Sequence, residues 1–215
     1  MRRSEVRSEE RGSNMRRTCV VAVLAVVTTA AWAAAAPASA GPEGHSVVRW
    51  DIINLTKGGV LLAGGAATST SSATGDTLTL TGTGQAEPAE EEAAGGGTFV
   101  HRDKNGAVLA RGVYTVKHFV SFKRASGSLV GSGVVDAIGE LGESHSGVLT
   151  VRVAFRVGGK VAARGTLVVT CALPGAPAGL EEGVTATARP VGSSVVLRFN
   201  EKEPDNGPTN FHIIR

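Results

Sequence analysis

The chain has 215 residues, with 22 basic and 19 acidic side chains and a formal net charge of +3. Residues 1–40 hold six Arg and three Glu, so residues 41–215 carry 16 charges of each sign and no net charge. This balance argues against any function that depends on a strongly basic domain, and we therefore expect no nucleic-acid partner.

Residues 1–40 have the three parts of a secretory signal peptide. Arg16 and Arg17 form a basic segment, and residues 19–36 form an apolar run rich in Ala and Val. Ala38-Ser39-Ala40 then gives the small-x-small pattern that a signal peptidase recognises. The sequence therefore predicts a secreted, extracellular protein.

Cleavage is expected between Ala40 and Gly41, which leaves no membrane contact in the mature chain. The apolar run is also about long enough to span a bilayer, but it is richer in Ala and Thr than in Leu and Ile and is followed by Pro37. Cleavage is therefore preferred over anchoring. Met15 is a second candidate for the start of the signal, and its paired arginines leave twin-arginine export open beside general secretion.

Residues 41–215 are expected to form a single β-rich domain, because a domain of about 150 residues already buries roughly 70% of its unfolded surface. Cys171 is the one cysteine in this part of the chain. An internal disulfide is thereby excluded from the mature monomer, and its core must hold the fold together.

Strands are predicted where apolar and polar residues alternate or where β-branched residues gather. The predicted strands are 47–53, 60–62, 77–81, 98–101, a strand from Val108 onward, 114–122, 129–137, 149–157, 161–173, 184–188, 195–199 and 211–214. The segments 66–75 and 85–97 are predicted loops, because they are rich in turn-forming or charged residues. No amphipathic helix is predicted.

Two tight turns are predicted between neighbouring strands. Gly158-Gly159 separates two alternating segments, and adjacent glycines supply the positive φ of a hairpin turn. Asn105-Gly106 is the dipeptide favoured in a type I′ turn, which predicts a second hairpin. Short strands joined by such turns predict an all-β fold, an antiparallel β-barrel of about 8–10 strands, with a two-sheet β-sandwich as the alternative.

Several segments resemble a family of uncharacterised secreted bacterial β-rich proteins. The segments are GVLTVRVAF (147–155), GTLVVTCALPG (165–175), EGVTAT (182–187), FNEKEP (199–204), NFH (210–212), GTF (97–99) and GVY (112–114). The resemblance implies a β domain and export, but no reaction, because the family has no established activity. Family members usually carry Trp-Asn where this chain has Phe199-Asn200, so no role is assigned to an indole there.

Cys171 is expected to be a structural buried thiol. It shares the apolar face of its strand with Val169 and Leu173, where a free cysteine usually behaves as a small hydrophobe. A nucleophilic thiolate would need a nearby cation or helix N-terminus to lower its pKa, and the strand offers neither. No catalytic residue is therefore assigned.

The candidate ligand-binding residues are His118, Tyr114 and Arg152. His118 has the same strand parity as Val116 and Phe122, which would point it into a barrel lumen. The five histidines are scattered and lack paired zinc-ligand spacing, and the Glu-rich stretch at 87–92 lacks the pattern of a calcium loop. No metal and no cofactor is therefore expected.

The preferred function is a non-enzymatic secreted protein that binds a small apolar ligand in a barrel or concave sheet, because barrels of about eight strands can enclose one. The alternative is a cofactor-free isomerase or cyclase that uses polar residues of the lumen, such as His118, Tyr114 and Arg152. The first predicts an apolar pocket and the second a pocket with convergent polar groups. The sequence leaves the ligand and the oligomeric state open.

Overall fold

The computed structural model describes residues 46–203 and 207–215. The fold is all-β, with 60% strand and 2% helix, as predicted. The proposed signal peptide and its cleavage site, between Ala40 and Gly41, lie outside the described residues. No helix among the described residues is long and apolar enough to cross a membrane.

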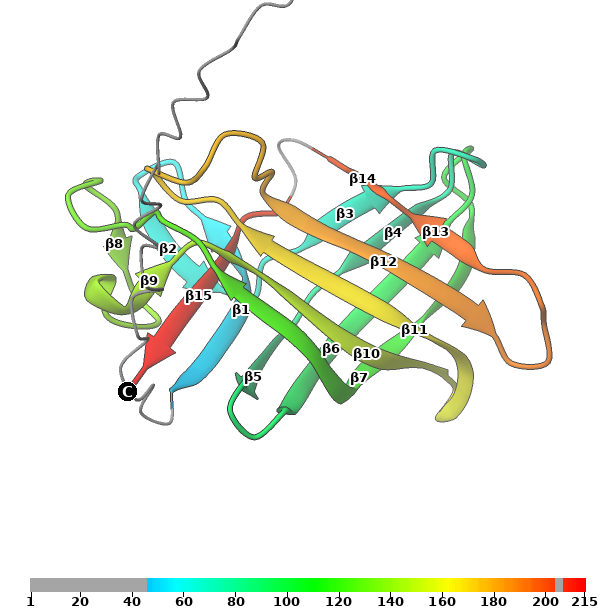
Figure 1. Cartoon of the computed structure of the whole chain (residues 1–215). Coiled ribbons are helices and arrows are strands. Elements are labelled where there is room, and N and C mark those ends of the chain that lie inside the picture. The colour runs from blue at the N-terminus through cyan, green and yellow to red at the C-terminus, as the bar shows by residue number, and fades with distance from the viewer. Residues whose placement is uncertain (1–45, 204–206) are drawn as a thin grey trace, which may run out of the picture. The chain divides into compact units, whose positions relative to one another are not determined.

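Fifteen strands and one short 3-10 helix make up the domain (Figure 1). In chain order they are β1 (Val47–Leu55), β2 (Val60–Ala63), β3 (Ala67–Thr70), β4 (Thr77–Leu80), β5 (Thr83–Glu87), β6 (Glu92–Arg102), β7 (Val108–Arg124), β8 (Val135–Asp136), η1 (Leu141–Glu143), β9 (Ser144–His145), β10 (Gly147–Val157), β11 (Lys160–Cys171), β12 (Gly183–Pro190), β13 (Leu197–Phe199), β14 (Glu201–Lys202) and β15 (Thr209–Ile214).

The strands form one large mixed sheet that backbone pairing does not close. Its main path runs β13-β12-β11-β10-β7-β6-β5-β1-β15-β9, and β4 and β3 branch from the second half of β6. All the strand pairs are antiparallel except β2 with β8. The long strands β6, β7, β10 and β11 are therefore consecutive neighbours. Short connections join β6 to β7 and β10 to β11, as predicted, whereas residues 125–146 separate β7 from β10.

The β10–β11 hairpin forms as predicted. Val157 pairs with Lys160, and the two residues between them, Gly158 and Gly159, have φ of 56° and 79°. Positive φ at both central positions is the requirement of a type I′ turn, which glycine meets without steric cost. Eleven paired positions then run back from this turn to Gly147 and Cys171.

The β6–β7 hairpin also forms, but its turn differs from the predicted type I′. Gly106 has a positive φ of 85°, whereas Asn105 does not have a positive φ. The connection is longer than two residues, and the Asp103 carboxylate accepts hydrogen bonds from the amides of Asn105 and Ala107. A side chain before the Asn-Gly dipeptide therefore organises this turn.

Two predicted loops are wrong in part. Segment 66–75 contains β3, and segment 85–97 contains most of β5 and the first half of β6. The composition explains the difference, because Ser, Thr and Ala dominate the first segment, whereas Glu, Ala and Gly dominate the second. Glycine is required in the second segment, since a Cβ on Gly97 would lie 1.9 Å from the carbonyl oxygen of Thr81. Close backbone approach therefore explains a composition that is typical of loops.

The predicted strand at 129–137 is also largely wrong, because only β8 forms there. Residues between β7 and β9 instead pack a small apolar cluster against the end of β1. Ile53, Leu61 and Leu129 are its buried centre. The partly buried side chains around them are Val134, Ile138, Leu141 and Leu173.

A single main core collects the inward-facing side chains of the sheet. Trp50 and Phe211 are fully buried, and Tyr114 is 1% exposed. Phe99 and Phe155 pack edge to face, with ring centroids 5.2 Å apart. Burial of such rings is the main favourable contribution to folding in a domain without a disulfide.

Candidate functional site

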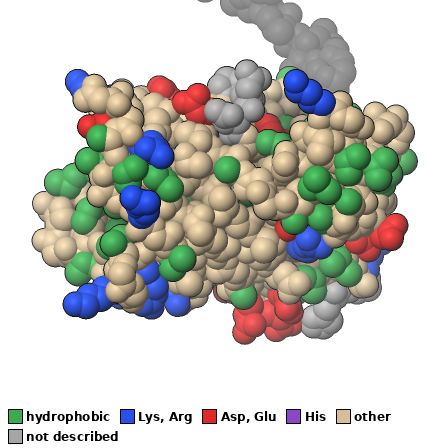
Figure 2. Space-filling view, turned by 180° about the vertical axis from the view of Figure 1, so that it is seen from behind, with side chains coloured by type: hydrophobic (Ala, Val, Ile, Leu, Met, Phe, Trp, Pro, Cys, Tyr) green, Lys and Arg blue, Asp and Glu red, His purple; other side chains and the backbone are tan. Residues whose placement is uncertain are grey.

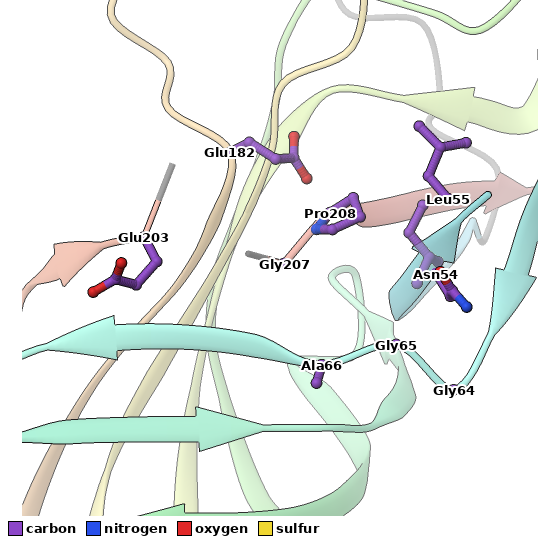
Figure 3. A pocket seen from close by; sticks show the side chains of 10 residues that line it. Asn54, Leu55, Gly64, Gly65, Ala66, Glu182, Glu203, Gly207 and Pro208 are labelled. Atoms are coloured by element: carbon purple, nitrogen blue, oxygen red, sulfur yellow. The ribbon is translucent and has the colours of Figure 1, made fainter. Parts of the chain in front are cut away.

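An open cleft of about 570 Å³ lies at the end of the sheet where β1, β12 and β15 meet (Figure 3). Five segments from three distant parts of the sequence contribute to it. Its lining residues are Ile53, Asn54, Leu55, Gly64, Gly65, Ala66, Glu182, Glu203, Gly207 and Pro208. The cleft is therefore made by the fold and has no local sequence signature.

Close backbone packing forms one wall of the cleft. The amide of Gly65 donates to the carbonyl of Ile52 at 3.1 Å, and the amide of Ile53 donates to the carbonyl of Pro208 at 2.9 Å. A Cβ on Gly65 would lie 1.8 Å from the carbonyl oxygen of Ile53. A glycine is therefore needed for the chain after β2 to cross β1 at this point.

Glu182 enters the cleft from the segment just before β12. One carboxylate oxygen accepts the Ala172 amide, and the other accepts the amide of Thr209 and its hydroxyl, the latter at 2.8 Å. Burial raises the pKa of Glu182, while these hydrogen bonds and Lys202 act in the opposite direction without cancelling the rise. The side chain is thus a desolvated carboxylate that is held by main-chain donors.

Glu203 supplies a second carboxylate from the residue after β14. Its Oε1 accepts the hydroxyl of Thr70 at 2.7 Å, and its amide donates to the carbonyl of Thr68 at 3.2 Å. Figure 3 shows Glu203 on one side of Glu182, with Pro208 and Leu55 on the other. The two carboxylates make this end of the cleft acidic.

The rest of the cleft offers apolar surface. Leu55 is 47% exposed although it is a large hydrophobic residue, and Ala66 and Pro208 also line the cleft. A concave surface with a few polar groups and neighbouring apolar side chains is typical of a small-molecule site. The arrangement can hold a cationic or hydrogen-bond-donating group at the carboxylates and an apolar body beside Leu55.

Tyr114, one of the three sequence-predicted ligand residues, lies in the core and outside this cleft. Its hydroxyl donates to the carbonyl of Thr81 at 2.9 Å, and burial raises its pKa far above the ordinary value. A Cβ on Gly82 would lie 2.3 Å from the same hydroxyl oxygen. Tyr114 is thus tightly packed within the core.

His118 and Arg152 lie directly opposite each other on β7 and β10, and both are exposed. The expectation that His118 shares a face with Val116 is wrong. The pairing register of β7 with β10 shifts at two irregularities. One of them leaves Lys117 as an extra residue between Val116 and His118. Such a bulge reverses the alternation of side chains, so His118 points outward while Val116 stays buried.

Cys171 is buried as predicted, with no exposed surface. Its thiol donates to the carbonyl of Thr209 at 3.3 Å. Burial, followed by the charge of Glu182, raises its pKa well above the ordinary value. The structure therefore gives Cys171 the surroundings of an unreactive thiol.

A buried polar cluster joins β15 to the segment around β8 and β9, and sequence reasoning missed it. His212 Nε2 lies 2.7 Å from a carboxylate oxygen of Asp136, which also accepts the Ser144 hydroxyl at 3.3 Å. The Asn210 side-chain amide donates to Ser144 at 3.1 Å. Because these residues are 66 to 76 positions apart in sequence, no motif connects them.

This cluster contains Ser, His and Asp but lacks the arrangement of a hydrolase triad. The Ser144 hydroxyl donates to Asp136, whereas in a triad it would donate to the histidine. Ser144 and His212 have no exposed surface, so a substrate cannot reach them. The cluster instead fixes the segment around β8 to β15.

The described residues contain no group of three or more His, Cys, Asp or Glu side chains that could hold a metal ion. No protein-family model, curated protein or solved structure matches this chain.

Proposed function

We propose that this protein is a non-enzymatic, exported binding protein whose ligand is a small amphipathic cation. The observation that carries the proposal is the cleft of Figure 3, which is lined both by the carboxylates of Glu182 and Glu203 and by the exposed apolar side chain of Leu55. Export rests on the N-terminal segment, in which Arg16, Arg17 and the apolar run precede Ala40.

The cleft is a better ligand seat than the interior of the sheet. The inward-facing side chains include fully buried aromatic rings, such as Trp50 and Phe211, and belong to one packed core. A ligand would have to displace these rings, and large core rearrangements cost several kcal/mol. We therefore propose that the apolar part of the ligand binds at the open end of the sheet and not in a barrel lumen. The ligand is further expected to carry a cationic head group.

We further propose that the sheet wraps into a barrel. Two features support this geometry. β13 pairs with β12 and β14 pairs with β3, and the amide of Asn200 between them donates to the carbonyl of Thr70 at 3.0 Å. At the other end, side chains bridge β11 and β15, where the Thr209 hydroxyl lies 2.8 Å from the carbonyl oxygen of Thr170.

The isomerase or cyclase alternative gains no support from these contacts. It needs His118, Tyr114 and Arg152 to converge on one substrate, but Tyr114 is buried while the other two are exposed on the outer face. Convergent polar groups are the minimum requirement for such chemistry. Binding without catalysis is therefore the function that we carry forward.

The test is calorimetric titration of the protein with octyltrimethylammonium and, in parallel, with octanoate. We expect the cation to bind and the anion of equal chain length not to bind. Glu203→Gln should weaken binding about fivefold, the effect of a partly exposed ion pair. Glu201→Gln removes an exposed charge that does not line the cleft and should leave binding unchanged.

Equal binding of octanoate, or equal effects of the two Glu→Gln variants, would refute the acidic cleft as the site. Leu55→Ser tests the apolar part independently. Because each buried methylene contributes about 0.8 kcal/mol, this variant should weaken octyltrimethylammonium more than tetramethylammonium. A parallel loss for both cations would contradict the proposed position of the alkyl chain.

A further inference from the structure

A second concave surface lies on the outer face of β7, β10, β11 and β12. It is a groove of about 620 Å³ that we call the basic groove. Its lining residues are Lys117, His118, Arg152, Val153, Arg164, Gly165, Thr187, Arg189 and Val196. Three arginines and one lysine thus line a groove that contains no carboxylate.

The strand register brings these charges together. Arg164 on β11 lies directly opposite Arg189 on β12, and Arg152 on β10 lies opposite Thr166, two positions from Arg164. Side chains that are directly opposite in an antiparallel pair have Cβ atoms about 5 Å apart, and diagonal neighbours are about 7–8 Å apart. The cations therefore form a row across neighbouring strands.

This row opposes folding, because like charges directly opposite each other in a sheet repel. Arg152 donates to the Thr166 hydroxyl at 2.8 Å, but Arg164 and Arg189 form no ion pair or side-chain hydrogen bond with any residue that the structure describes. Elsewhere the chain does pair such groups, as in the contact of 2.9 Å between Arg49 and Asp51. The two arginines are thus free to bind an external anion.

One edge of the groove is acidic. Lys117 and His118 also line an adjoining cleft with Glu87, Glu91 and Glu92 on the β5–β6 turn. The strongest positive field therefore lies toward β10, β11 and β12. Figure 2 shows the opposite face, seen from behind. Few charged side chains lie at the centre of that face, and its charged side chains gather toward the ends.

The donors of the groove suit phosphate groups. Arg presents a planar fork that binds phosphate through two parallel hydrogen bonds, and Thr187 adds a hydroxyl to the lining. No Phe, Tyr or Trp side chain lines the groove, so it lacks the large aromatic faces on which single-stranded nucleic acids and many sugars stack. The contacts therefore favour a ligand recognised by its charged groups alone.

The row is also longer than one phosphate. Neighbouring strands lie about 4.8 Å apart, so the distance from β12 to β7 is roughly 14 Å. From these observations, we infer that the basic groove docks a linear polymer with a phosphate in each repeat. This binding surface is separate from the acidic cleft and does not depend on the ligand proposed there.

The test uses the full chain and medium-chain inorganic polyphosphate, with binding measured by fluorescence anisotropy of end-labelled polymer. Arg164→Ala combined with Arg189→Ala should weaken binding about tenfold or more, and should lower the slope of log affinity against log salt by about two. Lys104→Ala combined with Lys160→Ala removes the same charge from the β6–β7 turn and from the start of β11, at exposed positions outside the groove, and should change affinity little.

Four results would overturn the inference. An equal loss in both double variants would show that net charge alone drives binding. Competition by orthophosphate at equal phosphate concentration would indicate a small-anion site, and preferential binding of heparin would indicate a sulfated polymer. Oligomers that form at low salt with the native chain but not with the Arg164→Ala, Arg189→Ala double variant would indicate that a second copy occupies the groove. Circular dichroism and thermal unfolding verify that each variant is folded.

Discussion

Glu182 accepts a hydrogen bond from the amide of Thr209 and thereby ties the start of β15 to the entrance of β12. Its other oxygen accepts the amide of Ala172, at the end of β11. β11 and β15 are adjacent but do not form a backbone ladder. One carboxylate thus satisfies two amides that would lack strand partners, which matters because unpaired buried amides are costly.

We predict that Glu182→Gln destabilises the protein by about 1–3 kcal/mol, because the amide nitrogen of Gln cannot accept one of the two amide hydrogens. Urea unfolding followed by tryptophan fluorescence measures the change. Glu181→Gln, at the exposed neighbouring position, is the matched control and should change the free energy of unfolding by less than about 0.5 kcal/mol. Equal stability of the two variants would contradict the bridging role.

A pH dependence of opposite sign to that of Glu182 is expected for Asp136. Burial raises the pKa of Asp136, but hydrogen bonds from Ile138, His212 and Gly139 outweigh it, so the folded-state pKa lies below the ordinary value. Its ionised form therefore stabilises the fold fully above about pH 4, and this contribution is lost as the pH falls through the lower folded-state pKa.

The measurement is the free energy of unfolding between about pH 6 and pH 2 for the native protein and for Asp136→Asn. The difference between the two should shrink as the solution is acidified. Glu140→Gln, an exposed position in the same segment, should keep the native pH profile. The pKa of Glu182 is raised in the folded state, so its pH dependence has the opposite sign to that of Asp136. The contribution of Glu182 to the free energy of unfolding falls as pH rises from about 4. A constant difference for Asp136→Asn would exclude the ionised contact with His212.

Local pattern was sufficient to predict the strands that carry the core. The alternation from Leu149 to Val157 predicts a half-buried strand, and the paired glycines at 158 and 159 predict a tight hairpin turn. β10 and β11 form this hairpin. His118 shows the limit of this reasoning. A bulge at Lys117 is set by the pairing of β7 with β10, and this extra residue reverses the parity of the side chains between it and the next irregularity, at Val120.

Neither the acidic cleft nor the basic groove is visible in a linear reading. Glu182 and Leu55 are far apart in sequence and meet only because β15 pairs with β1 beside the end of β11. Arg164 and Arg189 lie on separate strands, and their opposition depends on the β11–β12 register. Charge counts gave zero net charge for residues 41–215, which concealed how unevenly the charges are distributed over the surface.

Cys171 provides the last prediction, since its burial and the nearby charge of Glu182 both raise its pKa and so oppose thiolate formation. In a Cys19→Ser chain Cys171 is the sole thiol. We expect Ellman's reagent to label it at least about a hundredfold more slowly in native buffer than in urea, because reaction requires exposure and a thiolate. The comparison protein carries Val168→Cys on the same strand, together with Cys19→Ser and Cys171→Ser. Its single thiol is at a partly exposed position and should react faster than Cys171. Rapid labelling of native Cys171 would mean that the junction between β11 and β15 opens readily, and would contradict the tie that Glu182 provides there.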